Sequence, residues 1–278
     1  MFLVDWRMCA FRKDKKVRAK KSLGQHFLHD LNIARRIVDS LKPGSASNQN
    51  VLEIGPGMGV LTQYLLQQTD RNLKVIEIDR DSVAYLKKNY PELKEKIIEG
   101  DFLQLKLGEI FPGRFSIIGN FPYNISSQIF FKVLDDRDQV DQVVCMLQKE
   151  VADRIAAPPG SKTYGILSVL LQAYYKIEYL FKVPPGVFTP PPKVMSAVIR
   201  LERNNVGQLS CDEKLFVQVV KQAFNTRRKT LRNALKNLNL AAEISALPLM
   251  DKRAEQLSVE SFESLTLLIE RSRGATGS

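Results

Sequence analysis

Four consecutive residues, Asn120, Phe121, Pro122 and Tyr123, follow an apolar run at residues 115–119 and have the chemistry to recognise a planar base. A strand that ends in this order brings an amide, a rigid turn and an aromatic face to one edge of a sheet. The Asn120 side-chain oxygen and the Phe121 carbonyl can accept hydrogen bonds from an exocyclic amine, while Tyr123 stacks on the ring. Pro122 fixes its own φ and offers no competing N–H. The alternative is an ordinary strand-ending turn, in which Asn and Pro are common.

A glycine-rich segment upstream favours the base-binding interpretation. Residues 51–54 read as a buried strand, and a turn with Gly55 and Gly57 connects it to an amphipathic helix at residues 60–68. Glycines at such a turn let the backbone pass close to a ligand at a helix N-terminus. Val60 stands where a dinucleotide fingerprint has its third glycine, so the spacing disfavours a nicotinamide cofactor.

Three acidic residues lie at or near the ends of the expected strands. Glu53 lies on the strand before the glycine turn, and Glu77 ends a second apolar run. A carboxylate at the tip of the second strand suits the two ribose hydroxyls of an adenosine ligand. Asp101 follows a third strand at residues 97–99, where it can accept from the adenine amine. Taken alone, each acid would be interpreted as a solvated residue at the end of a strand. Together with the glycine turn, the three acids predict a cofactor that contains adenosine.

The order of these motifs resembles the S-adenosylmethionine-dependent methyltransferases that modify N6 of adenine. Within them the chain resembles the ribosomal RNA adenine dimethyltransferases, in the branch that acts on the small subunit. Three further segments carry the resemblance: SLGQHFL at residues 22–28, VFTPPPKVMSAV at residues 187–198 and FNTRRKTLRN at residues 224–233. The resemblance implies an α/β, Rossmann-like class I methyltransferase fold, with a doubly wound, mostly parallel sheet and a small all-α C-terminal domain.

The resemblance also implies S-adenosyl-L-methionine as the cofactor and no metal ion. The residues expected to bind the cofactor are His26, Leu28, Glu53, Gly55, Gly57, Glu77, Asp101 and Asn120. Phe188 is the candidate for the adenine face opposite Tyr123, with a loop anchor in the core as the alternative. Hydrogen bonds from N6 to Asn120 would localise the nitrogen lone pair. No general base is needed, because an N-methylated adenine ammonium loses its proton to water.

The implied substrate is a pair of adjacent adenosines in a hairpin near the 3′ end of 16S rRNA, methylated within the immature small subunit as part of its maturation. A base in structured RNA must leave its stack to enter such a pocket. Phe121 stands where the family more often has Leu, and the larger ring is expected to narrow or reshape the pocket floor.

Composition agrees with a nucleic-acid partner. The chain has 278 residues, 44% of them hydrophobic and 26% charged, and carries a formal net charge of +11. A basic protein of this size favours a polyanionic partner, although a basic pI alone is weak evidence. The widely spaced Cys9, Cys145 and Cys211 argue against a disulfide framework and a zinc site. The chain has no membrane-spanning apolar run and no signal sequence, so it is expected to be cytoplasmic. A monomer is also expected, although the sequence leaves the oligomeric state open.

Two segments concentrate the positive charge. Residues 7–21 carry eight Lys or Arg against one Asp, and residues 1–20 are predicted to be a basic tail that is disordered when free. Residues 214–240 contain no Asp or Glu. In this block Arg228, Arg232 and Lys236 recur at helical spacing, which predicts one phosphate-binding helix face. The residues expected to bind RNA are Arg227, Arg228, Lys229, Arg232 and Lys236.

Strands and helices alternate along residues 51–147, which indicates a parallel, doubly wound sheet. A helix is expected at residues 31–41 with Asp30 as its N-cap, and another at residues 164–175. Residues 177–183 and 196–201 look like a late strand pair. The predicted methyltransferase domain is residues 21–204, and after a linker at residues 204–208 a helical RNA-binding domain covers residues 209–278.

Three other functions compete with this prediction. A large-subunit rRNA adenine methyltransferase shares the cofactor turn and the tetrapeptide, but residues 187–198 and 227–233 favour the small-subunit branch. A ribosome-assembly or transcription factor that lost methylation is disfavoured by intact Glu77, Asp101 and residues 120–123. A nicotinamide-dependent oxidoreductase is disfavoured by the glycine spacing.

Overall fold

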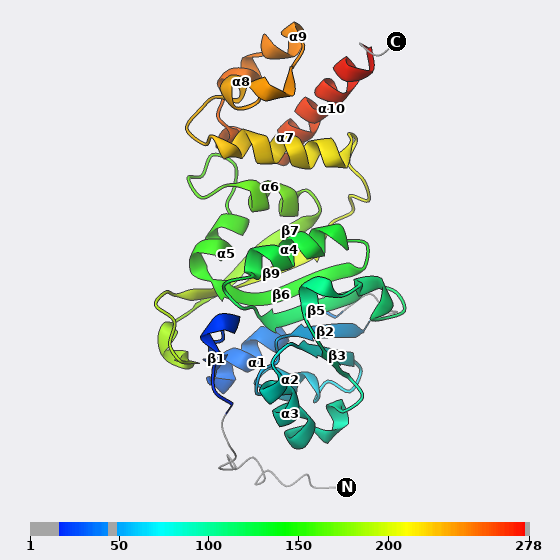
Figure 1. The fold of residues 1–278 in the computed structure, drawn as a ribbon, viewed down its shortest axis with the longest axis vertical. Coiled ribbons are helices and arrows are strands. Elements are labelled where there is room, and N and C mark those ends of the chain that lie inside the picture. Colours follow the sequence, from blue (N-terminus) through cyan, green and yellow to red (C-terminus); the bar gives the residue numbers. More distant parts are fainter. Residues whose placement is uncertain (1–16, 44–48, 276–278) are drawn as a thin grey trace.

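The computed structural model describes residues 17–43 and 49–275, and it is built around one seven-stranded sheet (Figure 1). The strand order is β4-β3-β2-β5-β6-β9-β7. The strands are β2 (Asn50–Ile54), β3 (Asn72–Glu77), β4 (Ile97–Glu99), β5 (Phe115–Asn120), β6 (Val140–Gln148), β7 (Tyr175–Val183) and β9 (Ser196–Arg203). The pairs from β4 to β6 are parallel, and β9 runs antiparallel to both β6 and β7. The predicted doubly wound, mostly parallel sheet is confirmed, as is the late strand pair.

Both faces of the sheet are buried, as a parallel sheet requires. Along β6, Val143 and Cys145 belong to one apolar cluster, while Val144 and Met146 belong to the other. The first cluster takes in side chains of α4 (Ser126–Asp135) and α6 (Ile166–Gln172), and the second takes in side chains of α1 (Leu31–Asp39) and α3 (Arg80–Asn89). The period-two alternation of the strand side chains therefore sorts the helices into two layers.

Each helix expected along residues 31–175 is present, but α1 ends at Asp39, two residues before its predicted end, and two others are shorter at both ends. The predicted cap of α1 is confirmed, since the Asp30 carboxylate accepts hydrogen bonds from the backbone N–H groups of Asn32 and Ile33. The helix expected at residues 60–68 is only α2 (Thr62–Leu65), because the glycine turn continues as far as Leu61.

The helix expected at residues 164–175 is shorter in the structure, where α6 covers only Ile166–Gln172. Tyr175 begins β7 instead, and its buried hydroxyl donates to the Val140 carbonyl at 3.1 Å. A further helix, α5 (Lys149–Ile155), was not predicted. It follows β6 directly, without a glycine or proline to mark its start.

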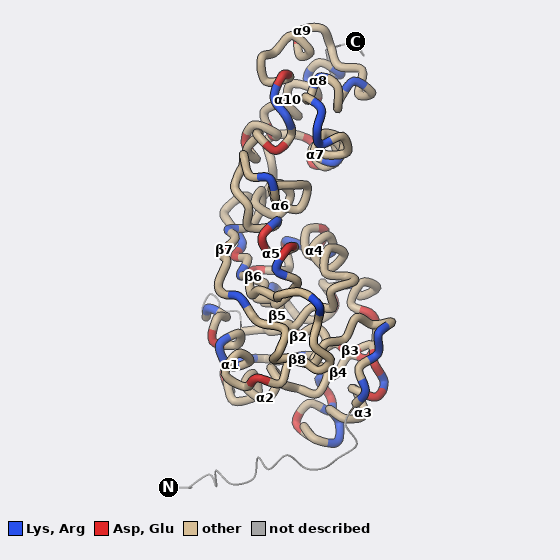
Figure 2. The backbone as a smooth tube through the Cα atoms, turned by 90° about the vertical axis from the view of Figure 1, so that its left-hand side faces the viewer, with Lys and Arg blue, Asp and Glu red and all other residues tan. Residues whose placement is uncertain are grey.

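The segment after β9 is helical, as expected, and stacks at one end of the elongated molecule (Figures 1 and 2). It contains α7 (Glu213–Asn225), α8 (Leu231–Ala234), α9 (Ala242–Ser245) and α10 (Val259–Ala275). Phe216 of α7 and Phe262 of α10 belong to the same apolar cluster as Leu167 of α6 and Phe130 of α4. The C-terminal helices are thus joined to the sheet domain by continuous packing.

The N-terminal prediction needs one correction. Residues 1–16 of the expected basic tail lie outside the described residues. Lys20, the last residue of that expected tail, belongs to the folded part, where its ammonium pairs with Asp79 and Asp81. The folded structure therefore begins before Lys21.

Candidate active site

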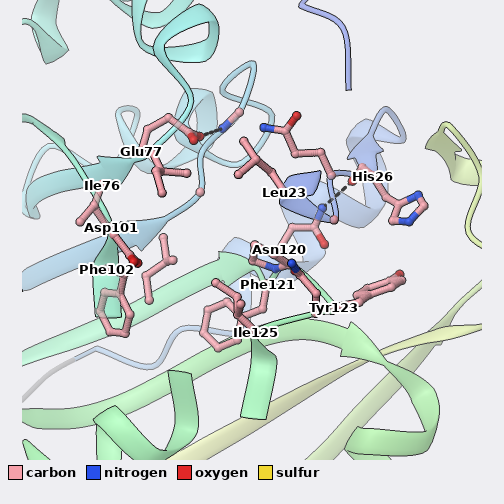
Figure 3. Close-up of a pocket in the computed structure, with 18 of the residues that line it drawn as sticks. Leu23, His26, Ile76, Glu77, Asp101, Phe102, Asn120, Phe121, Tyr123 and Ile125 are labelled. Carbon is pink, nitrogen blue, oxygen red and sulfur yellow. Dashed lines mark hydrogen bonds between the residues drawn. The ribbon is translucent and has the colours of Figure 1, made fainter. Parts of the chain in front are cut away.

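A cavity of about 260 Å³ opens at the carboxyl ends of β2, β3 and β5, where ligands bind in open α/β sheets (Figure 3). It brings together Gly55 and Gly57 after β2, Glu77 at the end of β3, and Asp101 after β4. The tetrapeptide of residues 120–123 lines the same cavity, and residues 22–27 close another side. Segments almost a hundred residues apart in the sequence therefore meet at one site.

The glycine turn has the backbone that its sequence predicts. Gly55 and Gly57 have φ values of 65° and 57°, in the left-handed region that favours glycine. A Cβ on Gly57 would lie 2.9 Å from the Phe27 ring, which occupies the space beside the turn. The absence of side chains here thus lets both Phe27 and a ligand approach the backbone.

Glu77 is held in place by two backbone donors. The N–H of Gly57 donates to one carboxylate oxygen at 3.0 Å, and the N–H of Asp79 donates to the other at 2.9 Å. The side chain is 4% exposed, and burial raises the pKa of its carboxyl while these backbone hydrogen bonds act in the opposite direction. An acceptor held this rigidly at a cavity wall suits vicinal hydroxyl donors.

Apolar side chains form the walls between the acidic groups. Ile78, which directly follows Glu77, is 51% exposed, and Phe102 and Leu23 also line the cavity. Asp101 caps the short 3₁₀ turn Phe102–Gln104 by accepting from the Leu103 N–H at 2.9 Å. Neither Ile78 nor Phe102 was a predicted site residue, although each directly follows a predicted acid. Apolar walls beside acidic acceptors have the chemistry that a purine ring and a ribose would need.

Asn120 presents its oxygen to the cavity. Its amide nitrogen donates to the His26 backbone carbonyl at 2.8 Å, which fixes the orientation of the side chain (Figure 3). His26 and Tyr123 are stacked with ring centroids 5.2 Å apart. The His26 Nδ1 lies 2.7 Å from the Pro190 carbonyl, and because a carbonyl only accepts, Nδ1 carries the proton.

Tyr123 is anchored at its hydroxyl. The phenol oxygen lies 2.5 Å from the hydroxyl of Ser196, a fully buried residue at the start of β9. Burial raises the pKa of Tyr123, so the phenol stays neutral. Ser196 belongs to the proline-rich stretch that supports the family resemblance, but the sequence alone assigned it no role.

The Phe121 ring is buried and packs into the apolar core. It is 1% exposed and meets Phe130 of α4 edge to face, with ring centroids 5.9 Å apart. A Cβ on Gly119 would lie 3.2 Å from this ring and 2.5 Å from the Ile54 carbonyl, so glycine makes the room that the ring uses. Because Phe121 also lines the cavity, its ring forms part of the cavity floor while it packs against the core.

Three predicted site residues lie outside the cavity. Phe188 is 2% exposed on β8 (Phe188–Thr189), where it pairs with Leu28 of β1 (Phe27–Leu28). Both side chains pack in the apolar cluster under α1, so Phe188 is the loop anchor of the alternative interpretation, and Leu28 is a core residue. Glu53 is 1% exposed and accepts from the Thr62 hydroxyl at 2.6 Å beneath the glycine turn. Burial raises the pKa of Glu53 to about 8.

The predicted single basic helix face is wrong. α7 ends at Asn225, Arg228 lies in the turn that follows, Arg232 is in α8, and Lys236 begins a 3₁₀ turn. The predicted face assumed one continuous helix, but the helix breaks at Thr226, where the backbone dihedral angles are no longer helical. The basic residues therefore lie on three short elements, in the part of the chain where Figure 2 marks several Lys and Arg positions along the tube.

Two of these basic residues have structural partners. Arg232 pairs with Asp251 at 2.7 Å, and Arg227 donates to the carbonyl oxygens of Lys162 and Tyr164. The acid that neutralises Arg232 comes from outside the block that contains no Asp or Glu. Arg228, Lys229 and Lys236 are exposed.

Within residues 17–43 and 49–275, no three His, Cys, Asp or Glu side chains gather as a metal site would require. In the same ranges, no helix has the length and apolar character needed to cross a membrane.

Comparisons with known proteins agree with this geometry. The chain is 61% identical over 255 residues to the ribosomal RNA small subunit methyltransferase A of Cytophaga hutchinsonii, an alignment that covers 92% of this chain and 98% of the relative. A dimethyladenosine transferase from Plasmodium falciparum superimposes with a TM-score of 0.73 at 26% identity, covering 90% of this chain and 98% of that structure. The 23S rRNA methyltransferase ErmE shares the fold, with a TM-score of 0.61 at 24% identity, over 86% of this chain and 99% of that one. The profile of ribosomal RNA adenine dimethylases matches residues 16–271, and the chain belongs to this family.

Proposed function

We propose that the protein uses S-adenosyl-L-methionine to dimethylate N6 of two adjacent adenosines near the 3′ end of 16S rRNA, acting as a monomer on the immature small subunit. The observation that carries the proposal is the orientation of Asn120. Its amide nitrogen donates to the His26 carbonyl, so its oxygen is left as an acceptor beside a cavity that Glu77 and Asp101 also line.

The residues of the cavity fit the proposed cofactor. Glu77, held by two backbone N–H groups, would accept from the ribose hydroxyls, and Asp101 would accept from the adenine amine. Ile78 and Phe102 would enclose the adenine ring, and the glycine turn would let the rest of the molecule pass close to the backbone. When bound, the cofactor supplies a methyl group on a sulfonium, which is an excellent leaving group.

The protein's contribution at the target base is to activate the nucleophile. Adenine N6 shares its lone pair with the ring. Acceptance of N6–H hydrogen bonds by Asn120 and by the Phe121 carbonyl localises that pair, and Tyr123 holds the ring by stacking. The proton displaced on methylation passes to water, so neither His26 nor another side chain acts as a general base.

The choice of the small subunit rests on similarity. The relative from Cytophaga hutchinsonii carries the small-subunit name at 61% identity. The exposed residues Arg228, Lys229 and Lys236 supply positive charge for binding phosphates beyond the cavity.

The test is methyl incorporation from labelled cofactor into immature small subunits, mature small subunits and large subunits, with the modified nucleoside identified after digestion. We expect dimethyladenosine in 16S rRNA from immature subunits, and far less of it at the same reaction time with the Asn120→Ala variant. Label recovered in 23S rRNA would assign the protein to the large-subunit branch. An absence of label in all RNAs, with intact cofactor binding, would favour a factor that has lost methylation.

A further inference from the structure

Residues 20–27 form a strap along one side of the proposed cofactor cavity. Three contacts fix its inner face: the Phe27 ring lies beside Gly57, the His26 carbonyl accepts from Asn120, and Gly24 lies against Asn124. A Cβ on Gly24 would be 2.6 Å from the Asn124 side-chain oxygen, and φ at Gly24 is 62°. The strap thus follows one path, pressed against the turn and the tetrapeptide.

The outer end of the strap is fastened to Asp79. This carboxylate is buried and accepts from the Lys20 ammonium, from the Gln25 amide at 3.3 Å and from the Ser82 hydroxyl at 3.0 Å. Lys20 also pairs with Asp81 at 2.6 Å, and its backbone N–H donates to the Gln25 side chain at 2.8 Å. Lys20 and Gln25 therefore both bind the Asp79 carboxylate at the N-terminus of α3, and a hydrogen bond also joins them to each other.

This fastening point adjoins the cofactor site. The N–H of Asp79 donates to Glu77, so the carboxylate that holds the strap belongs to the same turn as the proposed ribose acceptor. Burial by itself would raise the pKa of Asp79, but the hydrogen bonds from Lys20, Gln25 and Ser82 outweigh it and lower that pKa. Asp79 is therefore charged at neutral pH and needs its cationic partner.

We propose that the Lys20–Asp79 ion pair is a latch that holds the strap against the side of the cavity and sets the rate at which the cofactor and its demethylated product leave. The proposal rests on the proposed function, and Lys20 is a positioning residue that does not touch the ligand. The Lys20 side chain is 41% exposed, so salt screens the pair and loosens the strap.

The experiment measures dissociation rates of S-adenosylmethionine and S-adenosylhomocysteine by stopped-flow displacement across a salt series. The full-length proteins are wild type, Lys20→Met, Lys20→Arg and the matched control Lys21→Met. Lys21 is exposed, and its ammonium pairs with no carboxylate of the described residues. Thermal unfolding checks that each variant is folded.

We expect Lys20→Met to release both ligands about three- to tenfold faster, with a weaker salt dependence than wild type. Lys20→Arg should restore the slow, salt-sensitive release, and Lys21→Met should match wild type. Equal rates and salt slopes for wild type and Lys20→Met would overturn the latch. If wild type itself binds neither ligand, the proposed function fails instead, which keeps the two results distinct.

Discussion

The Asn120 amide illustrates how one hydrogen bond assigns a chemical role at the scale of a single residue. Because its nitrogen donates to the His26 carbonyl, its oxygen faces the cavity as an acceptor, as recognition of an exocyclic amine requires. The same carbonyl belongs to the strap, so the N-terminal segment helps to orient the residue proposed to activate the base.

Replacing Asn120 by Ala should reduce turnover by about a hundredfold or more, because the variant loses the acceptor that localises the N6 lone pair. Cofactor affinity should change much less, since Glu77 and Asp101 remain. Single-turnover methyl transfer and calorimetry measure the two quantities separately. A variant with wild-type turnover would remove Asn120 from catalysis.

Replacing Glu77 by Ala should weaken cofactor binding by about 1–3 kcal/mol through loss of the ribose acceptor. The structure adds a second consequence. The N–H groups of Gly57 and Asp79 lose their acceptor in a buried setting, so the melting temperature should also fall. Calorimetry on the folded fraction separates the two effects, and unchanged affinity would place Glu77 outside the ribose site.

At the scale of elements, the glycine turn rests on a buried pair between β2 and α2. Glu53 accepts from Thr62 directly beneath the turn, and it lies outside the cavity. The pair therefore joins the end of the strand to the start of the helix and supports the turn from below, without contact with the ligand.

The raised pKa of the Glu53 carboxyl predicts how the free energy of unfolding changes with pH. Its pKa is raised from 4.5 to about 8 by burial, so between these values the folded state holds a proton that the unfolded state releases. The free energy of unfolding must then fall as pH rises through this window. Glu53→Gln cannot titrate, so its stability relative to wild type should increase by on the order of 1–4 kcal/mol from pH 5 to pH 8.

Denaturant unfolding at pH 5, 6.5 and 8 measures this difference. Glu109→Gln is the matched control, because the Glu109 side chain is 71% exposed and should show no such trend. A difference between Glu53→Gln and wild type that stays constant with pH would mean that Glu53 is charged in the folded protein.

At the scale of the whole molecule, the basic residues of the C-terminal segment divide into two groups. Arg227 and Arg232 bind carbonyl or carboxylate groups of neighbouring loops, while Arg228 and Lys236 are exposed on different short elements. If RNA docks at this end, as we propose, it meets a scattered positive surface and not a single basic helix face.

The double variant Arg228→Gln, Lys236→Gln should weaken binding to immature small subunits. It should also lower the slope of log affinity against log salt by about one unit for each phosphate that no longer has a cationic partner. Methyl transfer at saturating substrate should survive, because neither residue lines the cavity. Binding assays across a salt series provide the measurement. Unchanged affinity at low salt would show that these side chains are only solvated and would move the docking surface elsewhere.

Local patterns in the sequence were enough to predict the class of fold, the family and several of the residues that meet at the cavity. Alternating apolar runs predict a parallel sheet because side chains of buried strands must face two helical layers. The carboxyl ends of parallel strands share one edge, which is why Gly55, Glu77, Asp101 and Asn120 could be assigned to a common site before their positions were known.

Packing between distant parts of the chain sets which candidate residues reach the cavity and which support it from below. Phe188, Leu28 and Glu53 are buried and lie outside the cavity. Whether an aromatic side chain or an acid is buried depends on elements that are far away in the sequence. The break after α7 and the pairing of Arg232 with Asp251 have the same origin, since helical spacing carries no information about where a helix stops or what packs beside it. The ion pair of Lys20 with Asp79 joins residues 59 positions apart. A local sequence pattern carries no information about contacts between residues so far apart in the chain.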